Sequence, residues 1–458
     1  MDASILLAQN IVRSHYDDIP VEVPEAIKKD ILDTLGVAIA GSSAPGGREI
    51  MELILEWGGK EESTVIMLGH RVPSPYAALV NGTMAHALDF DDAHEKYVLH
   101  AGVTVIPAAF AVAERVGQVS GKEFITALSL GIDVICRLGA ASIRNPSDLG
   151  HMYTSLYGVF GATAAAGKIL GLDEQEMVNA FGIAYSQASG NFQCIVDGAL
   201  TKRMQAGFAS SSGVTSALLA SKGLTGAKNS FEGLKGLFQV YHRGEYDPQP
   251  LTFDLGKNLG VTGLSFKPYP CCRNCHPFID ATLALAEEHN INPDNIDEIL
   301  VRCGEVARIL CEPLLQRQQP RVVVDAQFSI PWVVATALVK RKVTLEDFTP
   351  EAILNPSIKR ITSKITAEVD PQMDSRGTTS AFVQIRMKDS RAVCSRREDL
   401  AKGNPEKPMS FDEICDKFRN CTHYGVKTMS VKKASRVINM IRDLEKVNDV
   451  SQIIRLLG

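Results

Sequence analysis

Apolar residues recur at helical spacing up to about residue 245, so the first half of the chain is predicted to be all helical. Residues 24–41 form an amphipathic segment with proline in the first turn and glycine at the end, which is typical of helix boundaries. Ser120 with Glu123 and Asp173 with Glu176 have the spacing of capping boxes, which predict the starts of two further helices.

Three alanine-rich stretches beginning at Gly102, Gly158 and Gly213 resemble one another at nearly equal intervals, and each leads toward a predicted capped helix. Such an interval indicates a repeated pair of helices. The small residues of these stretches would let helix axes approach closely. The alternative is a chance similarity within an alanine-rich protein.

The pattern changes after residues 246–250, where prolines and glycines up to Gly263 indicate a crossing into a second domain. Alternating apolar residues at 298–303 and 381–387 predict half-buried strands. Residues 388–391 are predicted to turn the second strand back into a strand at 392–394.

Helical patterns at 277–289 and 330–340 lie between these strands, which predicts a smaller α+β unit. Ser410 with Glu413 forms another capping box, so the chain is expected to be helical again to its end.

Composition limits the classes of partner. The 458 residues exceed the size at which one hydrophobic core keeps growing, so two domains are expected. A net charge of -5 gives no basic field for nucleic acid or anionic lipid. No apolar run is expected to reach the roughly 20 residues of a membrane helix, and the N-terminus lacks a signal-peptide pattern, so we expect a cytoplasmic protein. The ten scattered cysteines are expected to be reduced thiols.

Candidate chemistry is concentrated in Asp89-Phe90-Asp91-Asp92-Ala93-His94-Glu95 and in His100, at the start of an apolar helix. Carboxylates and imidazoles so close together can remove and return a proton near neutral pH. The alternative interpretation is an acidic run that caps the helix in contact with solvent.

Two basic groups stand out against the acidic background: Lys202 with Arg203, and Lys267 with Arg273. Each lies in a turn marked by glycine or proline. A cation in such a loop can bind a carboxylate, and arginine does so through two parallel hydrogen bonds. The alternative is that they are solvated surface residues.

Residues 272–276 match the Cys-x-x-Cys-His pattern of covalent haem attachment, and with Cys271 they resemble a soft-metal site. Haem attachment requires export, and a zinc site requires a second ligand pair at a usable spacing. A tight turn with buried thiols is the favoured interpretation.

Asp91, Asp92 and Glu95 also fit the spacing by which helical terpene synthases bind magnesium and diphosphate. That fold needs an aromatic pocket, whereas 6% of the residues are aromatic. A helical scaffold without enzymatic activity is the remaining alternative.

The motifs around Asp89, His100 and Lys202 recur in one family together with two further motifs, and their order gives the resemblance its specificity. The chain resembles the MmgE/PrpD family, which includes 2-methylcitrate dehydratases, cis-aconitate decarboxylases and iminodisuccinate epimerases. The motifs are Asp89-Phe90-Asp91-Asp92, His100-Ala101-Gly102, Thr201-Lys202-Arg203, Lys267-Pro268-Tyr269-Pro270 and Lys402-Gly403-Asn404-Pro405.

This resemblance implies a large all-helical domain, residues 1–262 plus 400–458, with a smaller α+β lid domain, residues 263–399, inserted. It also implies a homodimer, a small di- or tricarboxylate as substrate, and neither metal nor other cofactor. The implied catalytic residues are Asp89, His100, His151, Lys202 and Lys267, and the implied substrate-binding residues are His94, Arg203, Arg273 and Trp332.

The implied reaction is proton abstraction from a carbon next to a carboxylate. The resemblance implies that His100 is the base or acid that exchanges a proton with this carbon. Asp89 would orient His100 or shuttle a proton, and His151 would protonate a departing hydroxyl. The family's decarboxylases have threonine at the position of Ala93 and tyrosine at that of Trp332. We therefore expect a hydro-lyase similar to 2-methylcitrate dehydratase, with epimerisation or decarboxylation as alternatives.

Overall fold

The computed structural model describes residues 1–458 except 375–378 and 389–392. The chain folds into two compact units. Unit 1 comprises Met1–Leu264 and Ser410–Gly458, and unit 2 comprises Ser265–Met409. The second segment of unit 1 begins at Ser410, whereas the sequence analysis began it at residue 400.

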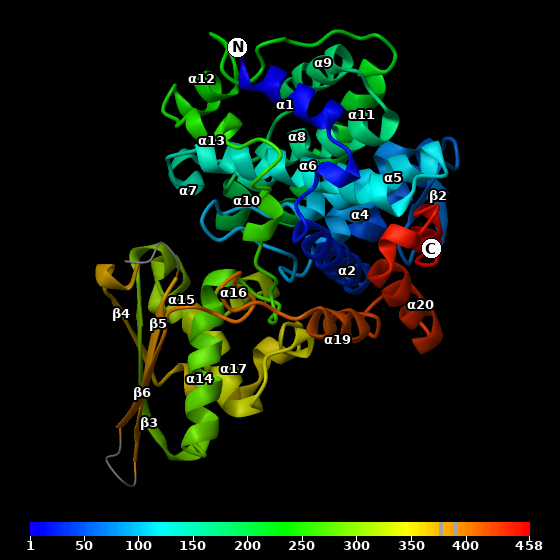
Figure 1. Ribbon diagram of the computed structural model, residues 1–458. Coiled ribbons are helices and arrows are strands. Elements are labelled where there is room, and N and C mark those ends of the chain that lie inside the picture. Colours follow the sequence, from blue (N-terminus) through cyan, green and yellow to red (C-terminus); the bar gives the residue numbers. More distant parts are fainter. Residues whose placement is uncertain (375–378, 389–392) are drawn as a thin grey trace. The chain divides into compact units, whose positions relative to one another are not determined.

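Unit 1 is mostly helical (Figure 1). All three predicted capping boxes are present at helix starts. At the first of them, the Glu123 backbone N–H donates to Ser120 Oγ at 3.3 Å. The longer helices are α1 (Ala3–Arg13), α2 (Val23–Gly41), α3 (Gly47–Trp57), α4 (Ser74–Ala85), α5 (Gly102–Val116), α6 (Gly121–Ala141), α8 (Tyr153–Leu170), α9 (Glu174–Tyr185), α11 (Thr201–Ala220), α19 (Phe411–Cys421) and α20 (Val431–Arg442). The short ones are α7 (Pro146–Leu149), α10 (Gln193–Val196), α12 (Leu237–His242), α13 (Gln249–Thr252) and α21 (Ser451–Arg455).

The prediction that this part is all helical is wrong at one place. Strands β1 (Ser63–Val65) and β2 (His70–Val72) form an antiparallel pair. Gly69 lies in the connecting turn with a φ of 73°, a conformation that glycine adopts without a steric penalty. Strands of three residues are too short for an alternating pattern to be recognised in the sequence.

Close helix packing at small residues is confirmed. A Cβ atom on Gly158 of α8 would lie 2.6 Å from the Thr104 side chain of α5, and one on Gly213 of α11 would lie 2.4 Å from Ala162 of α8. The repeat holds for α5 with α6 and for α8 with α9. It is wrong for the third copy, because turns and the short α12 follow α11.

Helix α6 is long and apolar enough to cross a membrane, which the sequence analysis overlooked. In the structure 94% of its apolar window is buried among other parts of the protein. Burial of this kind is common for the core helix of a globular domain.

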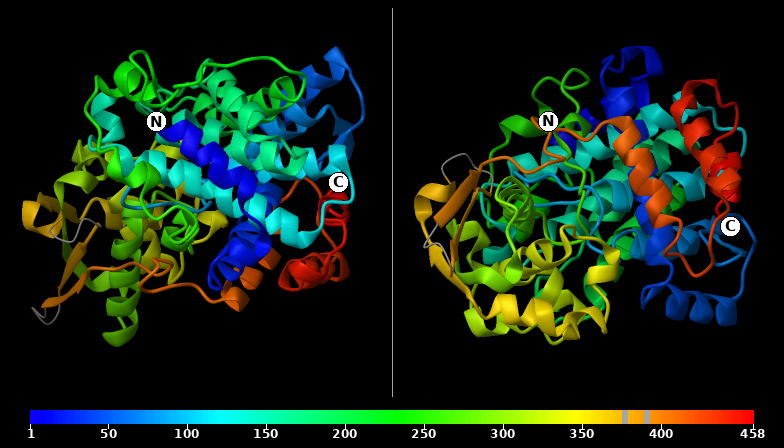
Figure 2. Two further views of the ribbon diagram at one scale, coloured as in Figure 1. Left: turned by 45° about the horizontal axis from the view of Figure 1, so that its top comes forward. Right: turned by 90° about the horizontal axis from the view of Figure 1, so that it is seen from below.

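The last part of the chain packs on the first part of unit 1. Helix α19 lies beside α2 (Figure 2). Lys417 of α19 places Nζ 2.6 Å from Asp33 Oδ1 of α2, and it donates to the Phe90 carbonyl, also at 2.6 Å. This contact attaches α19 directly to the segment that carries the candidate chemistry.

Unit 2 contains a mixed four-stranded sheet in the order β4-β3-β5-β6. The predicted strands at 298–303 and 381–387 are confirmed, and the strand at 365–369 was missed. Residues 389–391 of the predicted turn lie outside the described residues. The strands are β3 (Ile296–Cys303), β4 (Ile365–Val369), β5 (Ala381–Met387) and β6 (Val393–Glu398), with β3 and β4 parallel and the other pairs antiparallel.

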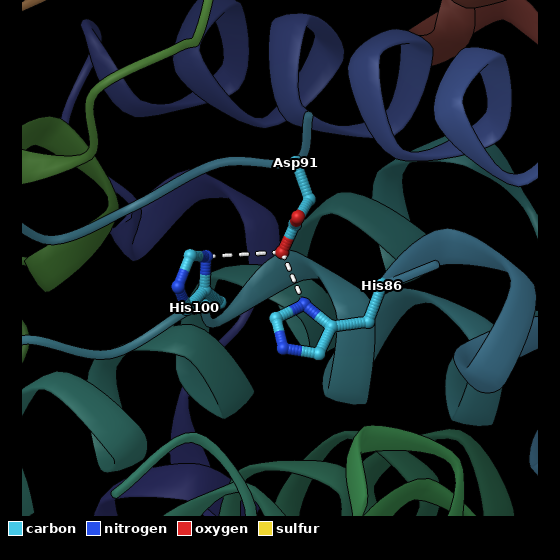
Figure 3. A group of neighbouring side chains, drawn as sticks. All are labelled: His86, Asp91 and His100. Atoms are coloured by element: carbon cyan, nitrogen blue, oxygen red, sulfur yellow. Dashed lines mark hydrogen bonds and ion pairs between the residues drawn. The ribbon is translucent and has the colours of Figure 1, made fainter. Parts of the chain in front are cut away.

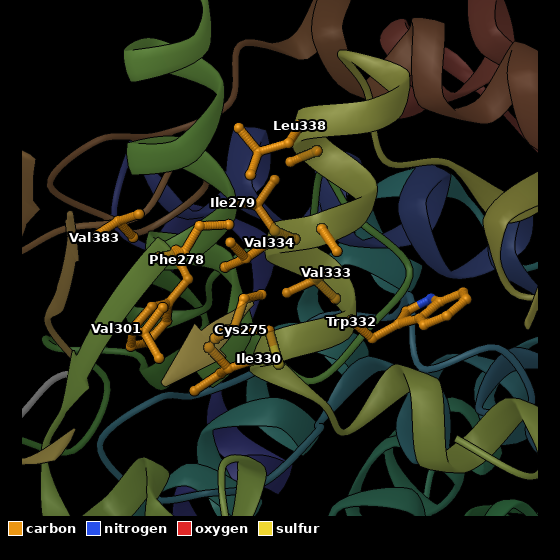
Figure 4. Close-up of a cluster of buried hydrophobic side chains, with 14 of the residues drawn as sticks. Cys275, Phe278, Ile279, Val301, Ile330, Trp332, Val333, Val334, Leu338 and Val383 are labelled. Carbon is orange, nitrogen blue, oxygen red and sulfur yellow. The ribbon is translucent and has the colours of Figure 1, made fainter. Parts of the chain in front are cut away.

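The two predicted helices of this unit are confirmed as α14 (His276–Glu288) and α17 (Ile330–Lys340). Their apolar faces pack together with the inner face of the sheet, where Phe278, Val301 and Val334 are fully buried (Figure 4). Smaller helices complete the unit: α15 (Leu314–Gln318), α16 (Val323–Gln327) and α18 (Pro356–Thr362).

Candidate active site

The candidate chemistry lies on the segment that connects α4 to α5. Asp89 has a φ of 54° and Val98 a φ of 53°, so two non-glycine residues of this short segment are left-handed. That conformation costs about 1–3 kcal/mol at each residue and is found mainly where the surrounding structure enforces it. The strain is consistent with a segment held in one particular shape.

Three side chains of this segment form a buried cluster, His86, Asp91 and His100 (Figure 3). Asp91 Oδ2 lies between the two imidazole rings, 2.8 Å from Nδ1 of His86 and 3.0 Å from Nδ1 of His100. The side chains of His86 and Asp91 are fully buried, whereas that of His100 is 19% exposed. Within this cluster, only His100 can meet a ligand.

Asp92 fixes the same region through both its side chain and its backbone. Its carboxylate accepts the backbone N–H groups of Ala101 at 2.9 Å and Gly102 at 3.2 Å, at the positive end of the α5 dipole. Its carbonyl oxygen lies 2.5 Å from Nδ1 of His100. The start of α5 and the imidazole of His100 are therefore positioned by one residue.

Burial changes the ionisation of this cluster. It lowers the pKa of His86 to about 4, and the positive charge of Lys202 adds to this effect. Burial, together with the charge of Asp91, raises the pKa of Asp92 to about 6. The pKa of Asp30, which is fully buried in α2, is raised well above its ordinary value by burial and by the charge of Asp92. At neutral pH His86 is therefore an uncharged imidazole.

The structure brings Asp89 and Lys202 together, as their shared assignment to one site requires. Lys202 Nζ, from the first turn of α11, lies 3.6 Å from Asp89 Oδ2, and both side chains are largely buried. Arg203 donates to the Pro45 carbonyl at 2.9 Å. Burial lowers the pKa of Arg203, and the nearby charges of Asp89 and Glu49 oppose this shift.

His151 lies in a second cluster. Its Nε2 is 3.2 Å from the Tyr241 carbonyl, and its ring centroid is 6.4 Å from that of His242. Nε2 of the fully buried His242 lies 2.6 Å from the Tyr157 hydroxyl, and burial lowers the pKa of His242 to about 4. The partners that the structure gives His151 are therefore neutral groups rather than Asp89 or Asp91.

His94 is also mostly buried. Its ring stacks on Tyr97 with centroids 4.0 Å apart, and burial lowers its pKa to about 4. Its backbone N–H donates to the Leu99 carbonyl at 2.8 Å, which closes the loop just before His100. In this structure His94 helps to shape the segment, and its role in substrate binding stays a prediction.

The remaining predicted residues belong to unit 2. Lys267 is fully buried there. Arg273 donates to the Lys402 carbonyl at 2.7 Å and lies 3.0 Å from Nδ1 of His276. Trp332 is fully buried at the start of α17, with its ring directed away from Val333 and Val334 (Figure 4). Participation of these three in one site with His100 stays a prediction.

His86, Asp91 and His100 are also close enough together to be considered as metal ligands. Nitrogen and oxygen ligands of a tetrahedral metal ion lie about 3.3 Å apart, given bonds of about 2.0–2.1 Å. The separations of 2.8 and 3.0 Å are shorter and match hydrogen bonds. The cluster therefore fits a hydrogen-bonded network, in which both imidazoles contact one carboxylate oxygen, better than a metal centre.

The other metal interpretations also lose support. Among the described residues, both Asp91 and Asp92 are buried against protein donors, which does not suit a magnesium diphosphate site. His276 is bound on both ring nitrogens, by Arg273 and by the Cys271 carbonyl at 3.3 Å, which does not suit haem or zinc ligation.

Sequence reasoning missed two residues of the central cluster. It gave the role of orienting His100 to Asp89, whereas Asp91 is the carboxylate at 3.0 Å from Nδ1 of His100. It left the role of His86 open, as a residue that could support the site without contacting the substrate. The spacing of His86, Asp91 and His100 follows no helical or strand period, because an irregular segment brings them together, so only the position of Asp91 within the motif hinted at its importance.

The structure thus defines a mostly helical protein with a smaller α+β unit and a buried cluster of acid and base groups. Comparison with known families identifies the chain further. It matches the MmgE/PrpD N-terminal domain over residues 6–249 and the MmgE/PrpD C-terminal domain over residues 269–446, so it belongs to the MmgE/PrpD family.

Individual relatives carry two kinds of name. The cis-aconitate decarboxylase-like protein oryM of Aspergillus oryzae is 28% identical over 96% of this chain and 94% of its own length. The cis-aconitate decarboxylase of Mus musculus is 28% identical over 94% of this chain and 88% of its own. The 2-methylcitrate dehydratase of Salmonella typhimurium is 23% identical over 74% of this chain and 72% of its own.

Proposed function

We propose that this protein is a lyase that acts on a small tricarboxylate by proton transfer at a carbon next to a carboxylate, and that it eliminates water. The observation that carries the proposal is His100, the partly exposed member of an otherwise buried cluster with Asp91 and His86. The names of the relatives support the substrate class, since cis-aconitate and 2-methylcitrate are both tricarboxylates.

In the proposed step, Nε2 of His100 takes the proton from the carbon next to a carboxylate. The electron pair of the broken C–H bond forms a C=C bond as the C–O bond to the hydroxyl group breaks. The hydroxide takes a proton and leaves as water, and the proton on His100 returns to solvent. Lys202 and His151 are the two candidates for the group that protonates the hydroxide.

Negative charge builds up on the substrate carboxylate as the proton leaves. A fixed cation stabilises this charge without having to reorganise, which is the most effective form of electrostatic catalysis. Lys202 beside Asp89 suits this role in unit 1. The proposal retains Lys267, Arg273, Arg203, His94 and Trp332 as candidates for substrate binding.

Decarboxylation is the second candidate, because the relatives that cover 94% or more of this chain are named for it. Position 93 argues for elimination of water instead. Ala93 is buried and offers no hydroxyl group in the segment between Asp92 and His94. Epimerisation needs the same base and a second acid on the opposite face of the carbon, so it remains a third outcome of the test.

The test is incubation of the purified protein with 2-methylcitrate, citrate and cis-aconitate, with iminodisuccinate for the epimerase. Loss of water produces an unsaturated acid visible by ultraviolet absorbance and NMR. Loss of carbon dioxide, or deuterium uptake without net conversion, would replace the proposal by decarboxylation or epimerisation.

Binding gives a separate check against the scaffold alternative. A tricarboxylate at 100 times its dissociation constant should stabilise the fold by about 2.7 kcal/mol, which raises the melting temperature. Absence of a shift with every acid would favour the scaffold. The cytoplasmic location and the homodimer stay predictions, which fractionation and light scattering would check.

A further inference from the structure

We propose that Asp91 is a positioning residue for His100 and that His86 is an uncharged clamp on Asp91. In this arrangement one carboxylate oxygen accepts the Nδ1–H of both imidazoles, which leaves the lone pair of His100 at Nε2. The inference rests on the proposed function for its kinetic consequences only, because the protons on Nδ1 of His86 and His100 can be observed without substrate.

The first step of the argument is the geometry of His100. Nδ1 has two acceptors within reach, the Asp92 carbonyl at 2.5 Å and Asp91 Oδ2 at 3.0 Å. Neither atom can donate when Asp91 is ionised, so Nδ1 must carry the proton. The backbone carbonyl alone is sufficient to select this tautomer. The distinct contribution of Asp91 is therefore its negative charge, which stabilises the imidazolium that forms when Nε2 takes a proton.

The second step is the charge of His86. Its Nδ1 lies 2.8 Å from the same oxygen of Asp91, and the two imidazole centroids are 4.9 Å apart. A charged His86 would compete for Asp91 and repel the imidazolium of His100. Because burial holds the pKa of His86 near 4, it donates a hydrogen bond without bringing a charge. Asp91 then accepts a hydrogen bond from His86 while its negative charge remains available to the imidazolium of His100.

Other charged groups face the cluster as well. Asp92 presents its carboxylate to the start of α5, and Lys202 lies near enough for its charge to act on His86, with Asp89 beside it. Asp30 lies behind Asp92 on α2. Asp91→Asn leaves these side chains in place, but it also lowers the pKa of Asp92 and of Asp30, which the charge of Asp91 raises. The NMR signals of His100 therefore have to accompany the pH profile.

The test compares Asp91→Asn with the unmodified enzyme. Asparagine keeps the size of the side chain but removes its charge. We expect kcat to fall by about 100-fold or more with little change in KM, because the lost stabilisation applies to the charged state formed during the reaction. We also expect the acid limb of the kcat profile to move to lower pH, since the imidazolium is less favoured. Asp443→Asn, which removes an exposed carboxylate that pairs with Lys446, is the control and should change neither.

A second pair of variants guards against a folding defect in Asp91→Asn. His86→Asn keeps an N–H donor near the position of Nδ1, whereas His86→Leu removes it. His86→Asn should retain kcat within about threefold, and His86→Leu should lose about tenfold or more, as expected for a lost hydrogen bond to a charged group. Equal losses in both variants would overturn the clamp.

NMR of protein with 15N-labelled histidine tests the arrangement without substrate. We expect Nδ1–H signals from both His86 and His100, and both should shift together in Asp91→Asn. A proton on Nε2 of His100 in the unmodified protein, or an unchanged kcat and acid limb in Asp91→Asn, would overturn the inference. If no tricarboxylate is turned over but the NMR signals behave as stated, the proposed function fails and this arrangement stands.

Discussion

Unit 1 contains two histidine clusters that differ in the charge of their partners. His86 and His100 share the carboxylate of Asp91, whereas His151 and His242 lie beside the Tyr241 carbonyl and the Tyr157 hydroxyl. A carboxylate stabilises an imidazolium and so lets a histidine gain a proton during a reaction, whereas neutral acceptors give much less of this stabilisation. The comparison therefore supports the proposal that His100 transfers the proton at carbon, and it leaves His151 as a candidate for protonating the hydroxide.

Replacement of His100 tests the first cluster most directly. His100→Ala should lower kcat by roughly 100-fold or more, because it removes the group that transfers the proton. Steady-state kinetics on the acid that is turned over provide the measurement. A kcat near that of the unmodified enzyme would remove His100 from this role and would contradict the proposed difference between the two histidine clusters.

Lys202 tests whether a fixed cation supports the same cluster. Lys202→Met keeps most of the length of the side chain and removes its charge. We expect kcat to fall by about 100-fold, as for the loss of a group that stabilises charge in the transition state. Lys222→Met is the control, because it removes the charge of an exposed lysine just beyond the C-terminal end of α11. Similar rates for the two variants would mean that Lys202 is not part of the site.

Gly102 tests how tightly the first cluster is built. A Cβ atom there would lie 2.6 Å from Asp30 Oδ1, 2.7 Å from Thr34 Oγ1 and 2.9 Å from Asp92 Oδ1. Gly102→Ala should therefore lower the free energy of unfolding by about 1–3 kcal/mol, which urea denaturation measures. Gly171→Ala tests an open position instead, where no atom lies within 4 Å but φ is 70°, so it shows the cost of backbone strain alone. A smaller loss at Gly102 than at Gly171 would contradict the crowding.

Asp30, which lies close to Asp91 and Asp92, should make the free energy of unfolding depend on pH. Its folded-state pKa is raised, so the folded protein binds this proton more readily than the unfolded chain does. Its contribution to stability therefore falls as the pH rises from the unfolded value of about 3.9 through the folded pKa, by at most about 1.4 kcal/mol per pH unit. Asp30→Asn carries no charge in either state, so its stability relative to the unmodified protein should increase between pH 5 and pH 8, measured by urea denaturation. A constant difference would contradict the burial of this carboxylate as the cause.

The smallest effect is expected in the second cluster. His151→Gln should lower kcat by about tenfold or less, equivalent to the loss of one neutral hydrogen bond. The kinetic comparison with His100→Ala then measures the difference between the two clusters. If His151→Gln is as damaging as His100→Ala, His151 is the acid that protonates the departing hydroxide, and the second cluster is catalytic.

Much of the fold could be predicted from local patterns. Capping residues such as Ser120 and Ser410 act within one helical turn, so the starts of α6 and α19 could be read from the sequence. Strands β1 and β2 were missed because three residues carry no usable period. Helix α6 was overlooked as a long apolar helix because Asp133 and Arg137 interrupt its apolar run.

The site was less accessible to sequence reasoning. The ordered motifs pointed to Asp89, His100 and Lys202, and the structure pairs Asp89 with Lys202. The role of Asp91 depends on the path of an irregular segment with left-handed residues at Asp89 and Val98, which no periodicity encodes. The neutrality of His86 depends on burial by distant parts of the chain, so it could not be derived from its neighbours in sequence.

The ion pair between Lys417 and Asp33 has a consequence for the order of events during synthesis. Lys417 also binds the Phe90 carbonyl, within the segment that carries the acid and base groups, yet it is separated from that segment by all of unit 2. A nascent chain that already contains Asp91 and His100 lacks the contacts of Lys417 with Asp33 and Phe90 until α19 has been synthesised. The ribosome must therefore translate through unit 2 and into α19 before this segment gains the contact, and termination directly after unit 2 yields a chain that lacks it.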